Sequence, residues 1–413
     1  MTKERVALSL VWCLAASCGP ASAPGVLLAS SKARVAVSAS AEDLSTAVAG
    51  NNAFAIDVYR KLVGTSSNVV FSPYSLTSAL AMTYGGAKGT TASAFESTLH
   101  VGQPPERFHR AMNTIDTALR SRGGSGRAFR LSVENQLFAQ KGFGLVESYL
   151  DLLATEYGAG VRELDFAAAT EASRQAINSW VKSNTEGLIP ELLGAGDVHS
   201  DTVLTLVNTV YFNAAWMTKF THQSTSPASF ELLDGTKKTV PTMFGKDLAG
   251  GAAVVDGTDV LELPYEGDEL AMILLVPPSG HLSDLEASLS PQVLDHFVGA
   301  LERGTIAVQL PKFSFSQRTS LESLLTSLGL GIAFTSEADF SAMSPEPIEV
   351  SDIIHEAVIR TDEDGTVAAA ATAVTMDRVS LPMYRVVNRP FIFFIRDRAT
   401  GSLVFMGRVV DPG

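Results

Sequence analysis

Residue types that could support catalysis occur in this chain, but not at the spacings that catalysis requires. His355-Glu356 has no second histidine four residues after the first, so the pattern of a zinc protease is absent. Gly123-Gly-Ser-Gly126 lacks the spacing of a nucleophile elbow, and no glycine-rich phosphate loop ending in Lys and Ser or Thr is present. The seven histidines are scattered without metal-ligand spacing. We therefore expect a protein that is not an enzyme, with no metal site and no cofactor.

The segment that begins at Thr361 is more informative than any of these residues. An acidic cluster ends at Gly365, and the chain then carries no charge from Thr366 to Met376. In an extended strand, Thr366, Ala368 and Ala370 would share one face with the alternate residues that follow them. Because burying an unpaired charge is costly, a segment of this composition could enter the middle of a sheet where an ordinary surface loop could not. A disordered alanine-rich linker is the alternative interpretation.

An ordered set of motifs, from about residue 45 to the end of the chain, resembles the serpin family. The motifs are Asn68-Val-Val-Phe-Ser-Pro-Tyr-Ser-Leu-Thr-Ser-Ala-Leu-Ala-Met82 with Gly86-Ala-Lys-Gly-Thr90, Ile177-Asn-Ser-Trp-Val181 with Thr185-Glu-Gly187, Leu206-Val-Asn-Thr-Val-Tyr-Phe212 with Trp216 and Phe220, Leu261-Glu-Leu-Pro-Tyr265, Leu310-Pro-Lys-Phe313, Leu328-Gly-Leu-Gly-Ile-Ala-Phe334, Ala338-Asp-Phe-Ser341, Asn388-Arg-Pro-Phe-Ile-Phe-Phe-Ile-Arg-Asp397 and Phe405-Met-Gly-Arg408. Any one of them is a weak signal, but the ordered set is specific.

The resemblance implies one α+β domain with three β-sheets, about eight or nine helices and an exposed reactive-centre loop. It also implies irreversible suicide inhibition of serine proteases. The protease cleaves the loop and forms its acyl-enzyme, and the loop then inserts into the main sheet as a central strand. The residues that would act as the hinge of this insertion are Glu363, Gly365, Thr366, Ala368, Ala369, Ala370 and Ala371. Val367 departs from the glutamate that the family commonly has there.

The position of the scissile bond follows from the family's loop spacing. Counting fourteen residues on from Gly365, as inhibitory relatives suggest, places the cut at Val379-Ser380. A valine before the cut suits an elastase-like protease with a small apolar pocket. The alternative bond is Arg378-Val379, which would suit a trypsin-like protease.

A second group of residues matches the family's sheet-opening cluster. A lone histidine in an apolar strand is usually a satisfied core group, and the resemblance sharpens that interpretation for His355. It groups His355 with Ser72, Ser75 and Asn208 beneath the largest sheet, where two central strands must part, and it places Trp216 near the top of that sheet. These residues would form hydrogen bonds and pack rather than catalyse.

The N-terminal residues are predicted to direct export. Positive charges precede an apolar stretch from Val6 to Ala16, which is shorter than the roughly 20 residues of a transmembrane helix. Ala15-Ala-Ser-Cys18 resembles a bacterial lipobox, so residues 1–18 are interpreted as a lipoprotein signal peptide and Cys18 as the lipidated residue. Cleavage near Ala21-Ser-Ala23, which would release an extracellular protein, and the absence of any cleavage are the alternatives. Residues 19–43 are predicted to be a flexible tether rich in Ala, Ser and Pro, and residues 44–413 to be the serpin domain.

Cysteine usage and composition fit this interpretation. Cys13 would be lost with the signal peptide, so the mature domain has no disulfide, and Cys18 as a free thiol or metal ligand is the weaker alternative. The hydrophobic content of 46% is typical of a globular protein with a large core, and the net charge of −13 argues against a nucleic-acid partner. We expect a monomer whose partner is a serine protease and whose only membrane contact is the lipid anchor. A non-inhibitory serpin that binds or carries a ligand, and an inhibitor of papain-like cysteine proteases, are the functional alternatives.

Periodicity supports the α+β assignment. Apolar residues at helical spacing predict a first helix over residues 45–63, and Pro73 predicts the start of a second helix that covers Ser75 to Thr83. Strands are predicted at 131–139, 203–212, 261–265, 270–276, 391–395 and 403–409. The near-continuous apolar character of the last two indicates strands buried on both faces.

Overall fold

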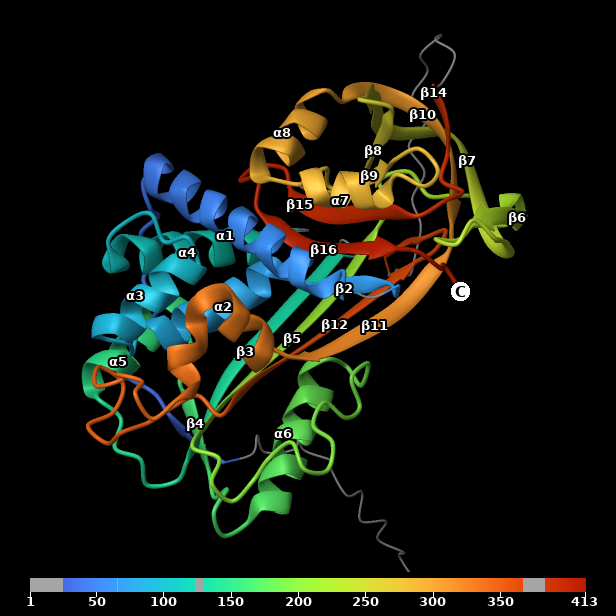
Figure 1. Ribbon diagram of the computed structural model, residues 1–413. Helices are drawn as coiled ribbons and strands as arrows, with labels where there is room; N and C mark the ends of the chain where they lie inside the picture. The colour runs from blue at the N-terminus through green and yellow to red at the C-terminus, as the bar shows by residue number, and fades with distance from the viewer. Residues whose placement is uncertain (1–24, 65, 123–128, 367–382) are drawn as a thin grey trace, which may run out of the picture.

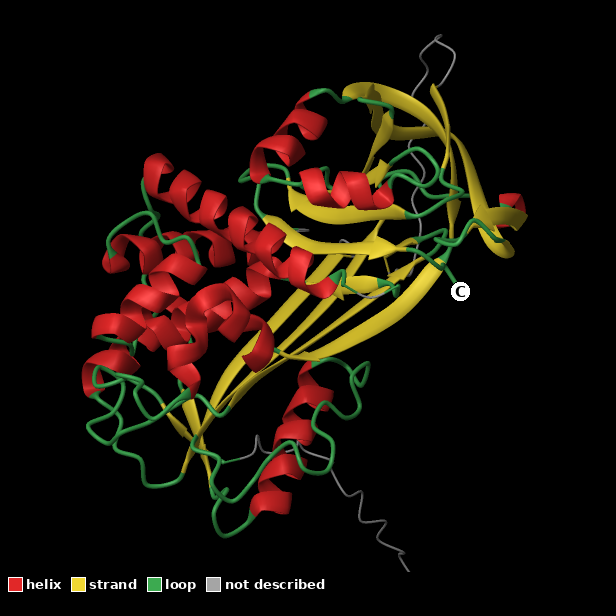
Figure 2. Cartoon of the chain, viewed as in Figure 1, coloured by secondary structure: helices red, strands yellow, loops and turns green. Residues whose placement is uncertain are grey.

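The computed structural model describes residues 25–64, 66–122, 129–366 and 383–413, which form one α+β body with two hydrogen-bonded sheets (Figures 1 and 2). The first sheet has seven strands. Their spatial order is β1 (Val26–Leu28), β4 (Val161–Leu164), β3 (Phe129–Gln140), β5 (Leu204–Ala215), β13 (Gly365–Thr366), β12 (Asp352–Thr361) and β11 (Phe313–Ser320).

The second sheet has nine strands. Its path is β14 (Met383–Val386), β10 (Glu302–Pro311), β7 (Lys237–Val255), β8 (Thr258–Pro264), β9 (Leu270–Val276), β15 (Phe391–Asp397), β16 (Leu403–Val409) and β2 (Val69–Phe71), and β6 (Ser226–Glu231) pairs with β7 off this path. The strand β7 is 19 residues long, and it pairs with β6 and β10 before it reaches β8. The expected three-sheet architecture would divide these nine strands between two sheets. Here the long strand β7 joins them into one hydrogen-bonded sheet.

Nine α-helices occur among the described residues. They are α1 (Ala41–Leu62), α2 (Pro73–Tyr84), α3 (Gly89–Thr98), α4 (Pro105–Ser121), α5 (Glu147–Leu152), α6 (Thr170–Asn184), α7 (Leu282–Ser288), α8 (Pro291–Gly299) and α9 (Glu322–Leu325). Short π or 3-10 turns lie at η1 (Leu153–Tyr157), η2 (His222–Ser224), η3 (Thr326–Leu330) and η4 (Gly331–Phe334).

The starts of the first two helices have local causes in the sequence. The side chain of Ser40 accepts a hydrogen bond from the Asp43 backbone N at 3.1 Å, so α1 begins four residues earlier than periodicity predicts. Ser72 caps α2 in the same way at the Ser75 backbone N, and Pro73 occupies the first helical turn, where its missing N–H is not needed. All twelve residues of α2 are buried.

Two layers of helix enclose the first sheet. The helix α2 contacts β3 and β5 on one side and β16 on the other, so it lies between the two sheets. The helix α6 covers the opposite face, where Ile177 and Val181 pack with Phe138, Val207 and Ile354. Figure 1 shows α6 set apart from α1 to α5 and alone against the lower half of the long strands.

The segment before α1 differs from the expected tether where the structure describes it. From Gly25 onwards it lies on the body, because β1 pairs antiparallel with β4 as an added edge strand. Arg34 then forms an ion pair with Asp116 of α4 at 2.7 Å, and the Val35 backbone N donates to Thr155 O at 2.8 Å. We call residues 25–40 the N-terminal strap. Cys18 and the rest of the predicted signal peptide lie outside the described residues.

Within the described ranges, the helices are all too short or too polar to cross a bilayer. No group of three or more His, Cys, Asp and Glu side chains in the same ranges is placed to hold a metal ion.

Candidate functional site

The hinge forms a two-residue strand inside the first sheet. The parallel strands β5 and β12 pair directly from Thr205 with Asp352 to Tyr211 with Val358. Beyond that point they separate, and β13 lies between them, with Gly365 opposite Ala215 of β5. On its other side β13 pairs antiparallel with β12 at Thr361. The sheet is thus already open at one end, and the opening is occupied by the first residues of the predicted insertion.

Glycine is required at position 365 by a close backbone approach. A Cβ atom built there would lie 2.1 Å from the carbonyl oxygen of Ala214 and 2.7 Å from Cα of Ala215, and φ is +154°. A side chain at this position would force the hinge away from β5. The predicted hinge residue Gly365 is therefore required here for a steric reason, the close approach of the β5 backbone.

Thr366 is fully buried, with no exposed surface. Its Oγ1 lies 2.8 Å from the hydroxyl of Tyr265, which is itself buried. The Tyr265 ring stacks on the indole of Trp216, with centroids 4.7 Å apart and planes 8° from parallel. The first side chain of the hinge therefore fits a closed site that accepts a small hydroxyl group. The remaining predicted hinge residues, Ala368, Ala369, Ala370 and Ala371, lie outside the described residues, as do Arg378, Val379 and Ser380.

The acidic turn before Gly365 is fixed by backbone hydrogen bonds. The Asp362 backbone N donates to Gly365 O at 2.9 Å, which closes the turn. Trp216 donates its indole N–H to Asp362 O and its backbone N–H to Asp364 O, both at 2.9 Å. Trp216 thus holds the turn that precedes the hinge strand β13.

Glu363 has a buried carboxylate that is held by an ion pair with the partly exposed Lys312. Its carboxylate accepts hydrogen bonds from Lys312 Nζ at 2.7 Å and from Thr225 Oγ1 at 2.6 Å, and its side chain is 4% exposed. Burial alone would raise the pKa of Glu363, but the bonds from Lys312 and Thr225 outweigh burial and lower the pKa to about 2. The carboxylate is therefore charged at neutral pH. This ion pair joins the start of the hinge to Lys312, which lies between β10 and β11.

A second cluster lies further down the same pair of strands, on the face toward α2. His355 Nδ1 contacts Asn208 Oδ1 directly across the β5–β12 pair, and His355 Nε2 accepts a hydrogen bond from the Ser72 backbone N at 3.2 Å. Asn208 Nδ2 donates to the carbonyl oxygen of Ser75 at 2.9 Å and also contacts Asn135 of β3. Burial lowers the pKa of His355 to about 3, so the imidazole is neutral at physiological pH.

The two clusters lie along one seam between β5 and β12, one where the strands are separated and one within their paired part. Asn208 and Ala215 are seven residues apart on β5, which corresponds to roughly 23 Å. The seam is open at the Trp216 end and closed at the His355 end. The second cluster, which we call the lower cluster, brings together all four predicted residues, Ser72, Ser75, Asn208 and His355. Asn135 is a fifth partner that was not predicted from the sequence. The roles of Tyr265, Lys312 and Thr225 were also not predicted, although Tyr265 and Lys312 lie within quoted motifs.

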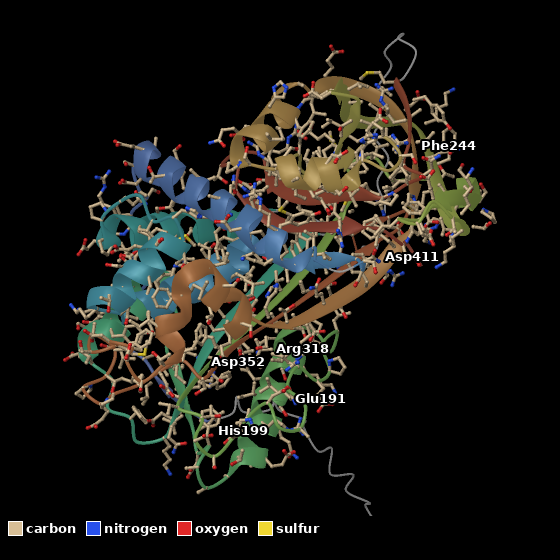
Figure 3. All side chains as sticks on the ribbon, viewed as in Figure 1. Glu191, His199, Phe244, Arg318, Asp352 and Asp411 are labelled. Carbon is tan, nitrogen blue, oxygen red and sulfur yellow. The ribbon has the colours of Figure 1, made fainter. Side chains whose placement is uncertain are left out.

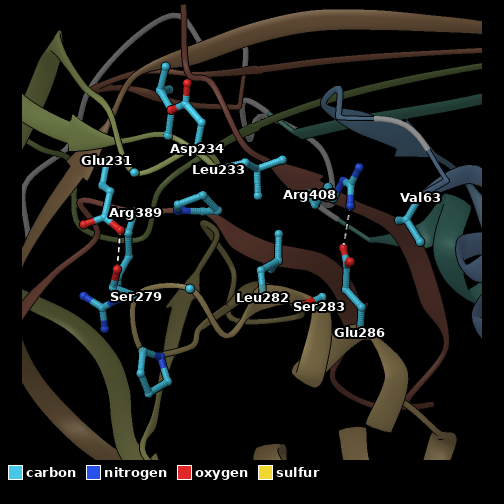
Figure 4. Close-up of a pocket in the computed structure, with 15 residues that line it drawn as sticks. Val63, Glu231, Leu233, Asp234, Ser279, Leu282, Ser283, Glu286, Arg389 and Arg408 are labelled. Atoms are coloured by element: carbon cyan, nitrogen blue, oxygen red, sulfur yellow. Dashed lines mark hydrogen bonds and ion pairs between the residues drawn. The ribbon is translucent and has the colours of Figure 1, made fainter.

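A pocket of about 510 Å³ lies away from this seam, between the β6–β7 turn, the segment before α7 and β16 (Figure 4). Its charged side chains form hydrogen bonds or ion pairs within the protein. Glu286 accepts hydrogen bonds from Arg408 and from the Tyr59 hydroxyl, each at 2.9 Å, and Arg389 Nε donates to Pro277 O at 2.6 Å. The charged side chains named here already have partners within the protein, and we assign the pocket no function.

The comparisons with known proteins agree with this geometry. The sequence profile described as Serpin (serine protease inhibitor) matches residues 49–412. The chain is a serpin. Leukocyte elastase inhibitor A of Rattus norvegicus is 37% identical over 385 residues, which cover 90% of this serpin and 100% of the relative.

Solved serpin structures have the same fold. A crystal structure of human thyroxine-binding globulin aligns with a TM-score of 0.80 and 28% identity, and covers 90% of this serpin and 99% of the globulin chain. Uncleaved ovalbumin aligns with a TM-score of 0.81 and 27% identity, and covers 89% of this serpin and 100% of the ovalbumin chain. The serpin fold and the α+β class are therefore confirmed, and the relatives support protease inhibition in general.

Proposed function

We propose that this serpin inhibits serine proteases irreversibly by inserting its cleaved loop between β5 and β12. The observation that carries the proposal is β13. Two hinge residues already occupy the central position of the sheet, paired on both sides and in the antiparallel direction that a longer inserted strand would continue. Further insertion adds backbone hydrogen bonds without burying a charge, because the residues that follow Thr366 are small and uncharged.

The proposed mechanism has two competing steps. The protease's nucleophile attacks the carbonyl carbon of the reactive bond, the amine of the downstream fragment leaves, and the loop is held as an ester on the enzyme. Insertion must then separate β5 from β12 along residues 205–211 and 352–358 before water cleaves that ester. The contact of His355 with Asn208 lies at this closed part of the seam, so it resists early opening.

Val379-Ser380 is our proposed reactive bond, and an elastase-like serine protease is the proposed target. The support is the fourteen-residue spacing from Gly365 and the small apolar side chain of Val379. The elastase-inhibitor name of a relative with 37% identity points the same way. Cleavage at Arg378-Val379 by a trypsin-like enzyme is the second candidate, since Arg378 immediately precedes Val379.

The experiment is incubation of the purified domain with an elastase and, separately, with trypsin, followed by denaturing gels and mass spectrometry. A complex that survives SDS, with the cut after Val379, supports both the mechanism and the proposed bond. A cut after Arg378 in such a complex keeps the mechanism and moves the bond. Clean cleavage by both enzymes without a complex contradicts inhibition of these proteases and favours a non-inhibitory, ligand-binding serpin. Complex formation with papain instead would indicate inhibition of cysteine proteases.

For localisation, we propose export of a bacterial lipoprotein anchored through Cys18. The support is the apolar stretch from Val6 to Ala16 and the Ala15-Ala-Ser-Cys18 motif. The strap begins at β1, which pairs with β4. The strand β4 in turn pairs with β3 near Gln140, whereas the end of β3 nearest the hinge is at Phe129. An anchor before β1 would leave the hinge end of the sheet facing away from the membrane. Labelling with a radioactive fatty acid, lost in Cys18→Ala, tests this proposal, and label retained in that variant contradicts it.

A further inference from the structure

A second large pocket lies among the helices, away from the seam between β5 and β12. It has a volume of about 710 Å³, and it is bordered by the end of α2, the starts of α3 and α4, and α5. Figures 1 and 3 show these helices gathered on the side of the body away from β6, with side chains crowded between them. Pockets that bind small molecules typically have volumes of about 300–1,000 Å³. We call this one the interhelical pocket.

His109 of α4 brings a ring nitrogen without a partner to the interhelical pocket. The residue is 3% exposed and lines the pocket together with Gly85. Its Nδ1 lies 2.6 Å from the Tyr157 hydroxyl, which is the only hydrogen bond that the ring makes within the described residues. The ring edge between the nitrogens is turned toward Gly85, where an added Cβ would lie 3.6 Å from His109 Cε1. A buried Nε2 is therefore left at the pocket without the partner that such an atom needs.

Two carboxylates flank the same pocket. The Tyr84 hydroxyl donates to Glu96 Oε1 at 2.8 Å. Burial raises the pKa of Tyr84, and the hydrogen bond to Glu96 and the negative charges of Glu96 and Glu106 raise it further. Both carboxylates thus lie near one hydroxyl at the pocket. Within the described ranges, neither of them forms an ion pair.

The positive charges at the pocket already have acidic neighbours. Arg110 forms an ion pair with Glu156 at 2.7 Å. The backbone N–H of Lys88 donates to Asp339 O at 2.8 Å. Hydrogen bonds from Ser341 lower the pKa of the Asp339 carboxyl, and the charge of Lys88 lowers it further. The two carboxylates near Tyr84 therefore leave an unbalanced negative charge at the pocket.

The other walls of the pocket are apolar or aromatic. The rings of Tyr84 and His109 lie together, with centroids 5.5 Å apart and planes at 31°. The small apolar side chains that line the pocket are Ala87, Ala92, Pro105, Leu152 and Ala342. Walls of this kind favour a flat apolar body, and the carboxylates favour a cation. No group of three or more His, Cys, Asp and Glu side chains in the described part of the chain is placed to hold a metal ion, so an organic cation fits better.

We propose that the interhelical pocket binds a small aromatic amine, with its ring against the apolar walls and its ammonium group toward Glu96 and Glu106. An N–H or O–H group on the ligand's ring donates to His109 Nε2, while Nδ1–H of the same imidazole donates to the Tyr157 hydroxyl. An alkylamine is protonated at neutral pH, as the lysine side chain is, so its charge complements the carboxylates. The pocket lies apart from the hinge, and the proposal does not depend on the proposed inhibition.

The experiment is isothermal titration calorimetry of the purified serpin with tryptamine, an indole ring that carries an ethylammonium chain. Indole-3-propionate is the matched probe, because it keeps the ring and the chain and replaces the ammonium group by a carboxylate. Ala92→Phe fills the pocket from α3, and Ser93→Phe is its control, since Ser93 is exposed and does not line the pocket. Glu96→Gln and Glu106→Gln each remove one carboxylate. Glu147→Gln is their control, because Glu147 is an exposed residue of α5 outside the pocket lining.

We expect one site for tryptamine with a dissociation constant of about 0.1 mM, and binding of indole-3-propionate that is at least about tenfold weaker. Glu96→Gln and Glu106→Gln should each weaken tryptamine binding about fivefold, as for the loss of one charge-assisted contact. Ala92→Phe should abolish the binding, and both control variants should match the wild type. Equal affinity for the two probes overturns the proposed class of ligand. Absence of saturable tryptamine binding up to about 5 mM, or unchanged binding by a folded Ala92→Phe, overturns the site itself.

Nitrogen NMR of the serpin with ¹⁵N-labelled histidines tests the contact with His109 directly. Saturating tryptamine should shift the Nε2 signal of His109, which is assigned by its loss in His109→Gln. The signal of His281, which is 60% exposed and lies before α7, should stay in place. Thermal unfolding of each variant reports its fold. If Ala92→Phe does not fold, the two glutamine variants and the His109 signal decide, and no change in any of them overturns the proposal.

Discussion

The hydroxyl of Tyr265 lies 2.8 Å from Oγ1 of Thr366, although the two residues are 101 positions apart in the chain. Through this contact the first hinge side chain after Gly365 is tied to Tyr265 in the β8–β9 connection, and the stacked Trp216 joins the same site. The resting state therefore contains the beginning of the strand that our mechanism completes. The ease with which the hinge enters or leaves this site should control what fraction of the serpin traps the protease and what fraction is cleaved as a substrate.

Thr366→Arg tests the demand for a small uncharged hinge side chain. Burying a guanidinium next to Tyr265 without a partner is costly, so the hinge should leave the sheet and insertion should slow, while the body remains folded. We expect the stoichiometry of inhibition to rise by about tenfold or more, with most of the serpin cleaved as a substrate. Thr366→Ser keeps the hydroxyl and is the control. An unchanged inhibition rate in Thr366→Arg would count heavily against insertion.

Gly365→Ala tests the close approach of the hinge to β5. The added Cβ would meet Ala214 O at 2.1 Å, so the hinge should withdraw from between β5 and β12. The indole of Trp216 would then gain a more polar environment, which a red shift of its fluorescence in a Trp180→Phe background reports. Gly299→Ala at the end of α8 is the control, because a Cβ there meets nothing within 4 Å. An emission spectrum identical to that of the parent would contradict this steric role.

His355 predicts a specific dependence of stability on pH. Its pKa is lowered from 6.5 to about 3 in the folded protein, so the unfolded chain binds a proton in this range and the folded chain does not. The contribution of His355 to the free energy of unfolding is complete above pH 6.5. It falls as the pH drops toward 3, by up to about 4 kcal/mol. His109, whose pKa burial lowers to about 4, contributes in the same direction.

Urea unfolding from pH 7 to pH 4 measures this dependence. Glutamine cannot take up the proton, so the free energy of unfolding of His355→Gln should depend less steeply on pH than that of the wild type. It should also be lower than that of the wild type at pH 7. His109→Gln provides the matched comparison for the second imidazole. Equal slopes in the wild type and in His355→Gln would show that the imidazole is not held neutral by burial.

The N-terminal strap predicts a stabilising role for Arg34. Its guanidinium pairs with the mostly buried carboxylate of Asp116, which also accepts a hydrogen bond from Tyr74 at 2.7 Å. Arg34→Ala leaves part of that buried charge uncompensated, so we expect a loss of about 1–3 kcal/mol in unfolding free energy. Lys32→Ala removes a pair whose lysine is 60% exposed, so its effect on the free energy of unfolding should be much smaller than that of Arg34→Ala. Equal effects of the two substitutions in thermal unfolding would contradict the structural role of Arg34.

The lower cluster could be predicted from the sequence because its members lie in recognisable motifs at strand and helix positions. Ser72 precedes a helix-starting proline, and Asn208 and His355 fall in apolar strands, where a polar side chain needs a partner. The meeting of Thr366 with Tyr265 could not be predicted, since it depends on how far the hinge has entered the sheet. That depth follows from a balance between pairing on both sides and the separation of β5 from β12.

The strap escaped prediction for a different reason. Residues 19–43 are small and polar enough to resemble a tether, and only the short run Val26–Leu28 hints at a strand. Its order comes from the free edge of β4 and from carboxylates on α4 and α5, which periodicity within the segment does not reveal. Sequence reasoning assigned the motifs of the domain more reliably than the contacts made by the segment outside it.

The most direct test of the central claim is the thermal stability of the loop-cleaved serpin. The reactive loop is cut with a protease that forms no complex, and unfolding of the cut and intact proteins is followed by circular dichroism under the same conditions. If the loop completes the strand that β13 begins, the cut form should unfold tens of degrees above the intact form, beyond about 90 °C. A cut form that unfolds at or below the temperature of the intact serpin would show that the loop does not insert, and it would contradict our account.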